Sequence, residues 1–155
     1  MKFVTSSILL AALAASSIAH AAGESAQVQV SGAVAVNCTL AVTPTAKASS
    51  LSILAGESAA VVGTVTENCN SGTGYTVTLT SANAGSLLST AAGAVPTTYQ
   101  ATYDDGAGAI ASQIVATRNN AQFGRQGDLK VSFAGNSQAV AGQYNDTLNL
   151  IIAAK

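Results

Sequence analysis

Strict alternation of apolar and other residues is the feature that most constrains this chain. Residues 26–38 read AQVQVSGAVAVNC, and every second residue is Ala, Val, Gly or Cys. Because side chains at i and i+2 of an extended strand share a face, the valines of this run fall on one face and the glutamines on the other. A period of two predicts a β-strand, whereas a helix would show a period near 3.6.

Further segments with the same period follow, separated by clusters of Gly, Asn, Asp and Ser. Short alternating strands between turn residues are typical of an antiparallel sandwich with Greek-key connections, and no capped amphipathic run predicts a helix. We therefore expect an all-β, immunoglobulin-like sandwich with a hairpin turn over 104–108. The expected strands are 61–69, 75–80, a weak one near Leu87, 97–103, 110–116, 129–133 and 142–152, with a short apolar pair at Leu51 and Ile53.

Residues 1–21 have the features of a secretory signal peptide. Lys2 precedes an apolar stretch over 3–19, and Ala19-His20-Ala21 fits the small-residue cleavage rule. The stretch is short and rich in Ala and Ser for a membrane-spanning helix. We expect export and cleavage after Ala21, or one residue later.

Composition argues against an enzyme. Cleavage would remove His20 and Met1, the only His and Met of the sequence, which also lacks Trp. Without an imidazole there is no Ser-His-Asp or Cys-His site and no histidine metal ligand, so we expect no catalytic residues, metal or cofactor. The 6 Lys and Arg residues are scattered singly, which excludes the clustered basic surface that nucleic acid requires.

The sequence has 2 cysteines, Cys38 and Cys69. An even number of cysteines in an exported chain predicts a disulfide. The alternative is a reactive thiol, which needs a neighbouring cation or histidine. Neither cysteine has such a neighbour in the sequence.

Two interpretations of the alternating run at 26–36 remain open on its pattern alone. It can be the first strand of the domain's own sheet. It can also be a free arm that adds as a strand to the sheet of another chain. Alternation is the same in both cases.

The segment GQYNDTLNL at 142–150 resembles the closing G-x-Y-x-D-T-L/V-x-V signature of the spore coat protein U family, which includes pilins of the archaic chaperone–usher pathway. TVTENC at 64–69 is similar to the family's T-V-T-x-x-C approach to the second cysteine, and 99–104 is similar to its Y-x-x-x-Y-x-D hairpin. The resemblance covers the layout of nearly the whole chain after residue 21. Residues 81–95 and 118–127 match nothing in the family pattern.

This resemblance implies a sandwich that lacks its last strand. In the family, a periplasmic chaperone fills the gap until the arm of the next subunit replaces it, and subunits leave through an outer-membrane usher. It implies a donor arm at 22–37, a pilin domain at 38–155, and a cell-surface pilus of identical or related subunits that supports adhesion and biofilm formation. The alternative is a secreted, monomeric β-sandwich binding module with a complete fold and a ligand cleft.

The resemblance carries three groups of positions over to this chain: a donor face, an acceptor groove and a C-terminal motif. From its place near the start of the strand, Tyr144 is expected to form a tyrosine corner, in which its hydroxyl bonds the backbone. Asp146 could act as a pocket acid, but we expect it to be a turn or strand-start partner. Gly32, a gap in the apolar series, marks a close approach or fixes the register. The donor face is Ala26, Val28, Val30, Gly32, Val34 and Val36; the acceptor groove is Leu148, Leu150 and Ile152 on a strand at 144–153; the C-terminal motif is Gly142, Tyr144, Asp146 and Thr147.

Overall fold

The computed structural model describes residues 23–155, apart from 105 and 111–112 and the side chains of 106–109. The predicted signal peptide and its cleavage site lie outside the described residues. The chain divides into one unit at Met1–Ala33 and a second at Val34–Lys155. In the first unit, the described residues 23–33 form no helix or strand.

The second unit is all-β, and every strand pair in it is antiparallel. One short 3-10 helix, η1 (Ala46–Ser49), follows the first strand. The strands are β1 (Cys38–Pro44), β2 (Gly56–Cys69), β3 (Tyr75–Ser81), β4 (Ser86–Leu87), β5 (Thr97–Thr98), β6 (Gln100–Tyr103), β7 (Gly106–Ala109), β8 (Ile114–Arg118), β9 (Gln122–Ala134) and β10 (Leu148–Ala154).

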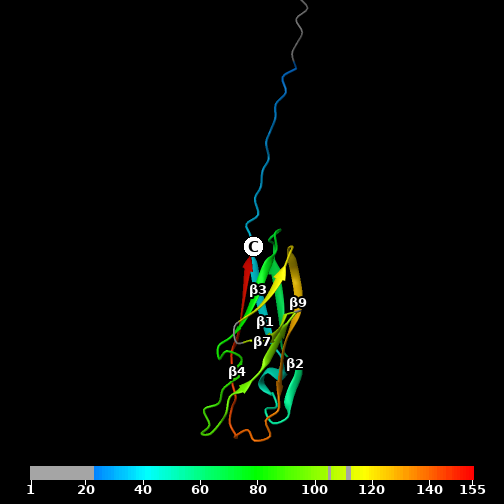
Figure 1. The fold of residues 1–155 in the computed structure, drawn as a ribbon. Helices are drawn as coiled ribbons and strands as arrows, with labels where there is room; N and C mark the ends of the chain where they lie inside the picture. The colour runs from blue at the N-terminus through cyan, green and yellow to red at the C-terminus, as the bar shows by residue number, and fades with distance from the viewer. Residues whose placement is uncertain (1–22, 105, 111–112) are drawn as a thin grey trace, which may run out of the picture. The chain divides into compact units, whose positions relative to one another are not determined.

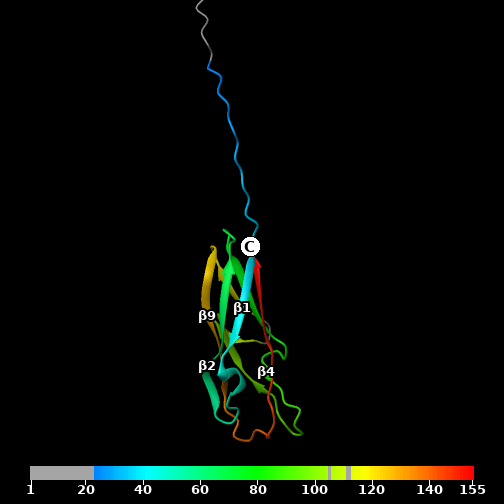
Figure 2. The same ribbon diagram turned by 180° about the vertical axis from the view of Figure 1, so that it is seen from behind.

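The strands form two facing sheets. The first has the order β1-β2-β9-β6-β7, the second has the order β10-β3-β8, and β4 and β5 form a separate two-stranded ribbon. β1 and β10 are edge strands of different sheets, and they lie beside each other along one side of the sandwich (Figure 1, Figure 2).

Alternation places the apolar side chains between the sheets. Val65 of β2 and Val77 and Leu79 of β3 are fully buried, as are Ala101 and Tyr103 of β6. The predicted disulfide is present: Cys38 and Cys69 oppose each other in the β1–β2 ladder and their sulfurs are bonded. It ties the start of the first strand to the end of the second.

The structure confirms the all-β antiparallel class and moves several predicted boundaries. The first strand begins at Cys38 because the ladder with β2 starts there, and the alternating residues 23–37 form no strand. The hairpin turn is narrower than 104–108, because Tyr103 already pairs with Gly106. The predicted return strand at 110–116 was wrong: β7 (Gly106–Ala109) returns along β6, and the next strand, β8, lies at Ile114–Arg118 and pairs with β3 of the other sheet. Leu51 and Ile53 lie in a turn region without a strand.

The predicted strands at 142–152 and 144–153 were too long. β10 begins at Leu148, and residues 142–147 form no strand, although Asn145 makes an isolated bridge to Leu88. β10 begins later than predicted because Asp146 shapes a loop before it. The Asp146 side chain accepts hydrogen bonds from Ser81, Asn83 and Thr147.

Candidate functional site

The two edge strands that lie side by side each have one paired edge. β10 pairs with β3 and β1 pairs with β2, and among the described residues no strand pairs with the other edge of either. A free edge presents backbone N–H and C=O groups that can bond a further strand. The side of the sandwich where these two edges lie is therefore a candidate site for strand addition.

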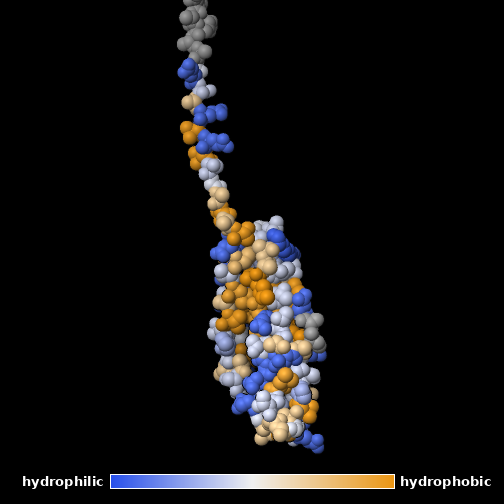
Figure 3. Space-filling model, turned by 90° about the vertical axis from the view of Figure 1, so that its left-hand side faces the viewer, coloured by the Kyte–Doolittle hydropathy of each residue, from blue (hydrophilic) through white to orange (hydrophobic). Residues whose placement is uncertain are grey.

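Apolar side chains lie along both strands. The three predicted groove residues of β10 are half-buried and pack against the core. Val42 of β1 is 42% exposed. Figure 3 looks onto the side of the sandwich where β10 lies and shows apolar side chains gathered in a patch along it. We call this set the edge groove: Leu40, Val42, Leu51, Ile53, Leu148, Leu150 and Ile152.

A cavity of about 700 Å³ opens at the end of the groove where β10 begins. Its wall includes Val42, Leu51 and Leu148, and it reaches core residues Val131 and Phe133. The two sheets are therefore not fully packed against each other here, and the space suits further apolar side chains.

The alternating run at 26–36 presents its valines to solvent. Val28, Val30 and Val34 are 87%, 90% and 88% exposed, and Val36 is 63% exposed. Nothing lies within 4 Å of the position that a Cβ on Gly32 would take. One chain thus carries both a regularly spaced apolar run in water and an apolar groove with free strand edges, while Ala26, on the same face, is exposed as well.

The C-terminal motif shapes the loop that leads into β10. The Tyr144 hydroxyl donates to the Val140 carbonyl oxygen at 3.0 Å, which is the backbone bond expected of a tyrosine corner. A Cβ on Gly142 would lie 2.8 Å from the Ser89 hydroxyl oxygen, so this position needs glycine for close approach.

Asp146 joins three segments at the start of β10. Its carboxylate accepts hydrogen bonds from the Ser81 and Tyr99 hydroxyls, both at 2.5 Å, and from the Asn83 and Thr147 amides at 3.0 and 2.7 Å. Burial, reinforced by the bond to Asp146, raises the pKa of Tyr99. With its oxygens engaged in this way, Asp146 fixes the β10 entry, as a turn or strand-start partner would.

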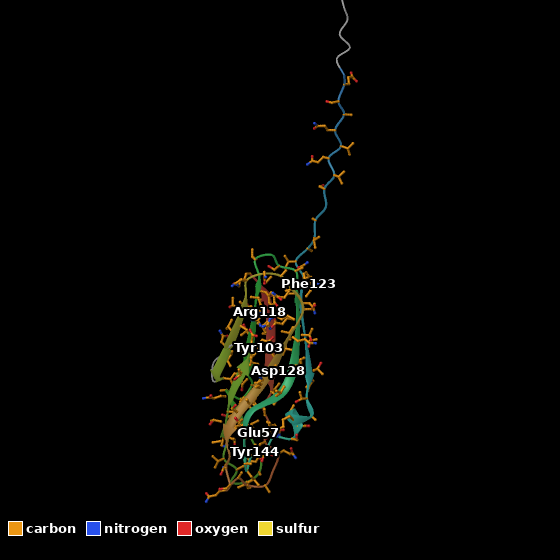
Figure 4. All side chains as sticks on the ribbon, turned by 90° about the vertical axis from the view of Figure 1, so that its right-hand side faces the viewer. Glu57, Tyr103, Arg118, Phe123, Asp128 and Tyr144 are labelled. Atoms are coloured by element: carbon orange, nitrogen blue, oxygen red, sulfur yellow. A yellow bond between two sulfur atoms is a disulfide. The ribbon has the colours of Figure 1, made fainter. Side chains whose placement is uncertain are left out.

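The sequence interpretation missed a buried polar cluster between the sheets. Glu67 of β2 is fully buried, and its carboxylate accepts from the Arg118 guanidinium at 2.7 and 3.0 Å. It also accepts from the hydroxyls of Tyr75, at 2.5 Å, and Tyr103. Figure 4 shows Arg118 and Tyr103 close to each other and away from Tyr144.

The cluster extends to a second pair of charges. Asp104 accepts from Arg118 at 2.8 Å and from Arg125, which also approaches Glu67 at 3.5 Å. Burial acts to raise the pKa of Glu67, but the bonds from Arg118, Tyr103 and Tyr75 outweigh it and hold that pKa below its ordinary value. Burial and the Glu67 carboxylate raise the pKa of Tyr75 to about 12. These groups are saturated with partners and have a structural role.

Among the described residues, no three His, Cys, Asp or Glu side chains come together as a metal site. Within the same part of the chain, no helix has the length and apolar character to cross a membrane.

No protein-family model matches the sequence, and no curated protein matches it. Among solved structures, the chain is similar to the minor tip subunit HdaB of the E. coli Hda pilus, with 13% identity over 75% of this chain and 79% of that one. The TM-score is 0.39. A likeness at this level supports no inference about function.

Proposed function

We propose that this chain is a structural subunit of a surface pilus that polymerises by donor-strand exchange. One observation carries the proposal: the chain has free strand edges beside an apolar groove, and it also has an exposed arm whose valines repeat every second residue. The arm of one subunit would enter the edge groove of another. Strand addition of this kind uses backbone bonds for affinity and alternate side chains for specificity.

The strand order supports a missing strand at this position. An immunoglobulin sandwich has strands A, B, E and D in one sheet and C, F and G in the other. Here β1-β2-β9-β6 follows the order A-B-E-D, and β3 and β10 take the places of C and F. The place of G, beside β10, is free among the described strands, and the incoming arm would occupy it.

The energetics also favour the exchange. Each valine that leaves water and enters an apolar groove contributes about 1.5–3 kcal/mol before ordering costs. An incoming strand antiparallel to β10 would also bond its free edge, as strand G does with F. A contact between the arm of one copy and the groove of the next is head-to-tail and does not close, so repetition yields a filament.

The partners of such a subunit follow from its exposed edge. A free strand edge beside apolar surface is an aggregation hazard, so the subunit needs an escort before assembly. We propose a periplasmic chaperone for this role, an outer-membrane usher for export, and identical or related subunits as the final partners. The filament would stand on the cell surface and support adhesion and biofilm formation.

The test is a comparison of unheated and boiled samples of the exported protein on SDS gels, beside a variant that lacks residues 22–36. The proposal predicts a ladder of multimers that boiling collapses and that the deletion abolishes. A single monomer band in both lanes, from a cooperatively folded protein, would contradict it.

The alternative function, a monomeric binding module, draws on the cavity of about 700 Å³. A self-complete sandwich would use that space for a ligand. However, a complete fold requires the arm as the domain's own strand, and residues 23–37 form none. The gel separates the two functions, because a binding module that includes the arm as its own strand gives a single monomer band in the unheated and in the boiled sample.

A further inference from the structure

Asn70 bonds the base of the arm through both its backbone and its side chain. Asn70 follows the last residue of β2, and its backbone N–H donates to the Asn37 carbonyl oxygen at 3.2 Å. Its side-chain oxygen accepts from the Asn37 N–H at 2.7 Å, and its side-chain NH₂ donates to the Ala35 carbonyl oxygen at 2.8 Å. One residue therefore engages three backbone groups and extends the β1–β2 pairing past the disulfide.

We propose that Asn70 is a positioning residue that keeps residues 35–37 extended and so directs the arm to a second copy of the chain instead of to the groove of its own domain. The inference rests on the proposed function. It adds the reason why a chain with both an arm and a groove does not close on itself.

The even numbering of the apolar residues shows which way of folding the arm back onto its own domain Asn70 opposes. Leu40 faces the core, whereas its neighbours Thr39 and Ala41 are exposed. Directly opposed residues of a hairpin share a face, so an arm folded back along β1 must set its even-numbered valines opposite the even-numbered residues of β1. A loop with an even number of residues would turn those valines to solvent.

The shortest in-phase loop, 35–37, begins and ends at the two residues that Asn70 bonds. With the turn at 35–37, Val34 would oppose Cys38 and Val30 would oppose Val42. A longer in-phase loop at 33–37 contains the same three residues. For the arm to fold back onto its own domain, these residues must therefore form a turn. The turn breaks the bonds that Asn70 makes to Ala35 and Asn37.

An amide is the group that this position requires. It accepts from one backbone N–H and donates to one backbone carbonyl at the same time. Asp has the same shape but carries no donor when ionised, so Asn70→Asp would lose the bond to Ala35 and place a negative charge beside its carbonyl oxygen. Asn70→Ala would lose both side-chain bonds.

The experiment compares the full exported chain with Asn70→Asp and Asn70→Ala on unheated SDS gels, together with amide exchange at Asn37. Asn120→Asp is the matched control, because Asn120 is exposed in the loop before β9 and its substitution adds the same charge. Thermal unfolding is followed in parallel, and Asn70→Asp, which keeps the side-chain shape, serves if Asn70→Ala fails to fold.

We expect both Asn70 variants to raise the ratio of closed monomer to multimer about five- to tenfold, the scale of losing one or two exposed hydrogen bonds. A closed monomer would run as a compact band that boiling shifts. Faster exchange of the Asn37 amide should accompany the change in Asn70→Ala, whereas Asn70→Asp keeps an acceptor for that N–H, and the control should match the parent. Parent multimers with an unchanged ratio in both variants would overturn this inference alone, whereas a parent without multimers would overturn the proposed function and this inference with it.

Discussion

The two edge strands of the second sheet, β8 and β10, differ in what their side chains contact. At one edge, Arg118 of β8 reaches into the buried cluster around Glu67. At the other edge, β10 leaves its outer backbone without a strand partner among the described residues and exposes part of its apolar side chains. In the described part of the chain no buried side-chain nitrogen or oxygen lacks a partner.

This difference is what the proposed donor-strand exchange requires of a small sandwich: one region held by directional bonds and one able to take a further strand. The Glu67 cluster joins β2 and β6 of the first sheet to β3 and β8 of the second through directional bonds. The side chains of this cluster are all engaged, although β8, like β10, has one edge without a strand partner among the described residues. At the β10 side, backbone groups lack a strand partner among the described residues and a cavity lies beside them. An incoming strand with alternating apolar residues would bond the backbone groups and fill the cavity.

The largest expected effect comes from placing a charge on the arm. Val30→Asp should abolish multimers and leave the domain folded, because an unpaired carboxylate entering an apolar groove costs several kcal/mol. Gln29→Asp is the control, since the neighbouring residue faces away from the groove and its variant should assemble normally. Unheated gels measure both, and normal multimers from Val30→Asp would refute the donor face.

The next largest effect comes from breaking the buried ion pair between Glu67 and Arg118. Glu67→Gln removes the charge that pairs with Arg118 and should lower the free energy of unfolding by about 3–5 kcal/mol, the usual cost of breaking a buried ion pair. Glu57→Gln, on the same strand, should cost less than about 1 kcal/mol because its partner Lys47 is exposed. Urea titrations compare the two variants, and equal losses would show that the cluster adds no special stability.

The disulfide should contribute slightly less. Cys38→Ser opens a loop with a sequence separation of 31 residues. The chain-entropy model gives about 3–4 kcal/mol for such a loop, so the variant should unfold at a lower temperature and accumulate less in the periplasm. Unchanged yield and thermal stability would mean that the bridge is idle.

Titration of the cluster gives the smallest effect. Because the folded pKa of Glu67 lies below its ordinary 4.5, the unfolded chain takes up the proton first as pH falls, and stability should drop below about pH 4.5. Tyr75, whose pKa is raised to about 12 from 10.0, makes stability fall as pH rises from 10.0 towards 12. Thermal unfolding across pH should show both slopes, with a weaker acid slope in Glu67→Gln; identical acid slopes would exclude Glu67 as the source.

Alternation was sufficient to predict much of the fold. The segments 61–69, 75–80 and 129–133 lie in β2, β3 and β9, because Val and Thr at a period of two have few other stable arrangements. Leu148, Leu150 and Ile152 share a face of β10 as predicted. The start of the first strand could not be predicted, because alternation runs through Cys38 without a break and only pairing with β2 decides where the ladder begins.

The buried cluster left a signal in the sequence that was not used. Glu67 lies between Val65 and Cys69 on the buried face of its strand, and Arg118 lies on the face of Ile114 and Ala116. A charged residue in phase with buried neighbours needs an opposite charge. Which charges meet depends on sheet order, since 51 residues separate these two, and that order was not available from spacing alone.

The most direct test of the account is hydrogen exchange along β10 in assembled multimers. In an antiparallel pair, successive residues alternate between bonding the partner strand and facing away, so β3 protects only alternate amides of Leu148–Ala154. If a donor strand occupies the other edge, all the β10 amides should exchange slowly in the multimer. Fast exchange at alternate β10 amides in the multimer would show that the edge stays open and would contradict donor-strand assembly.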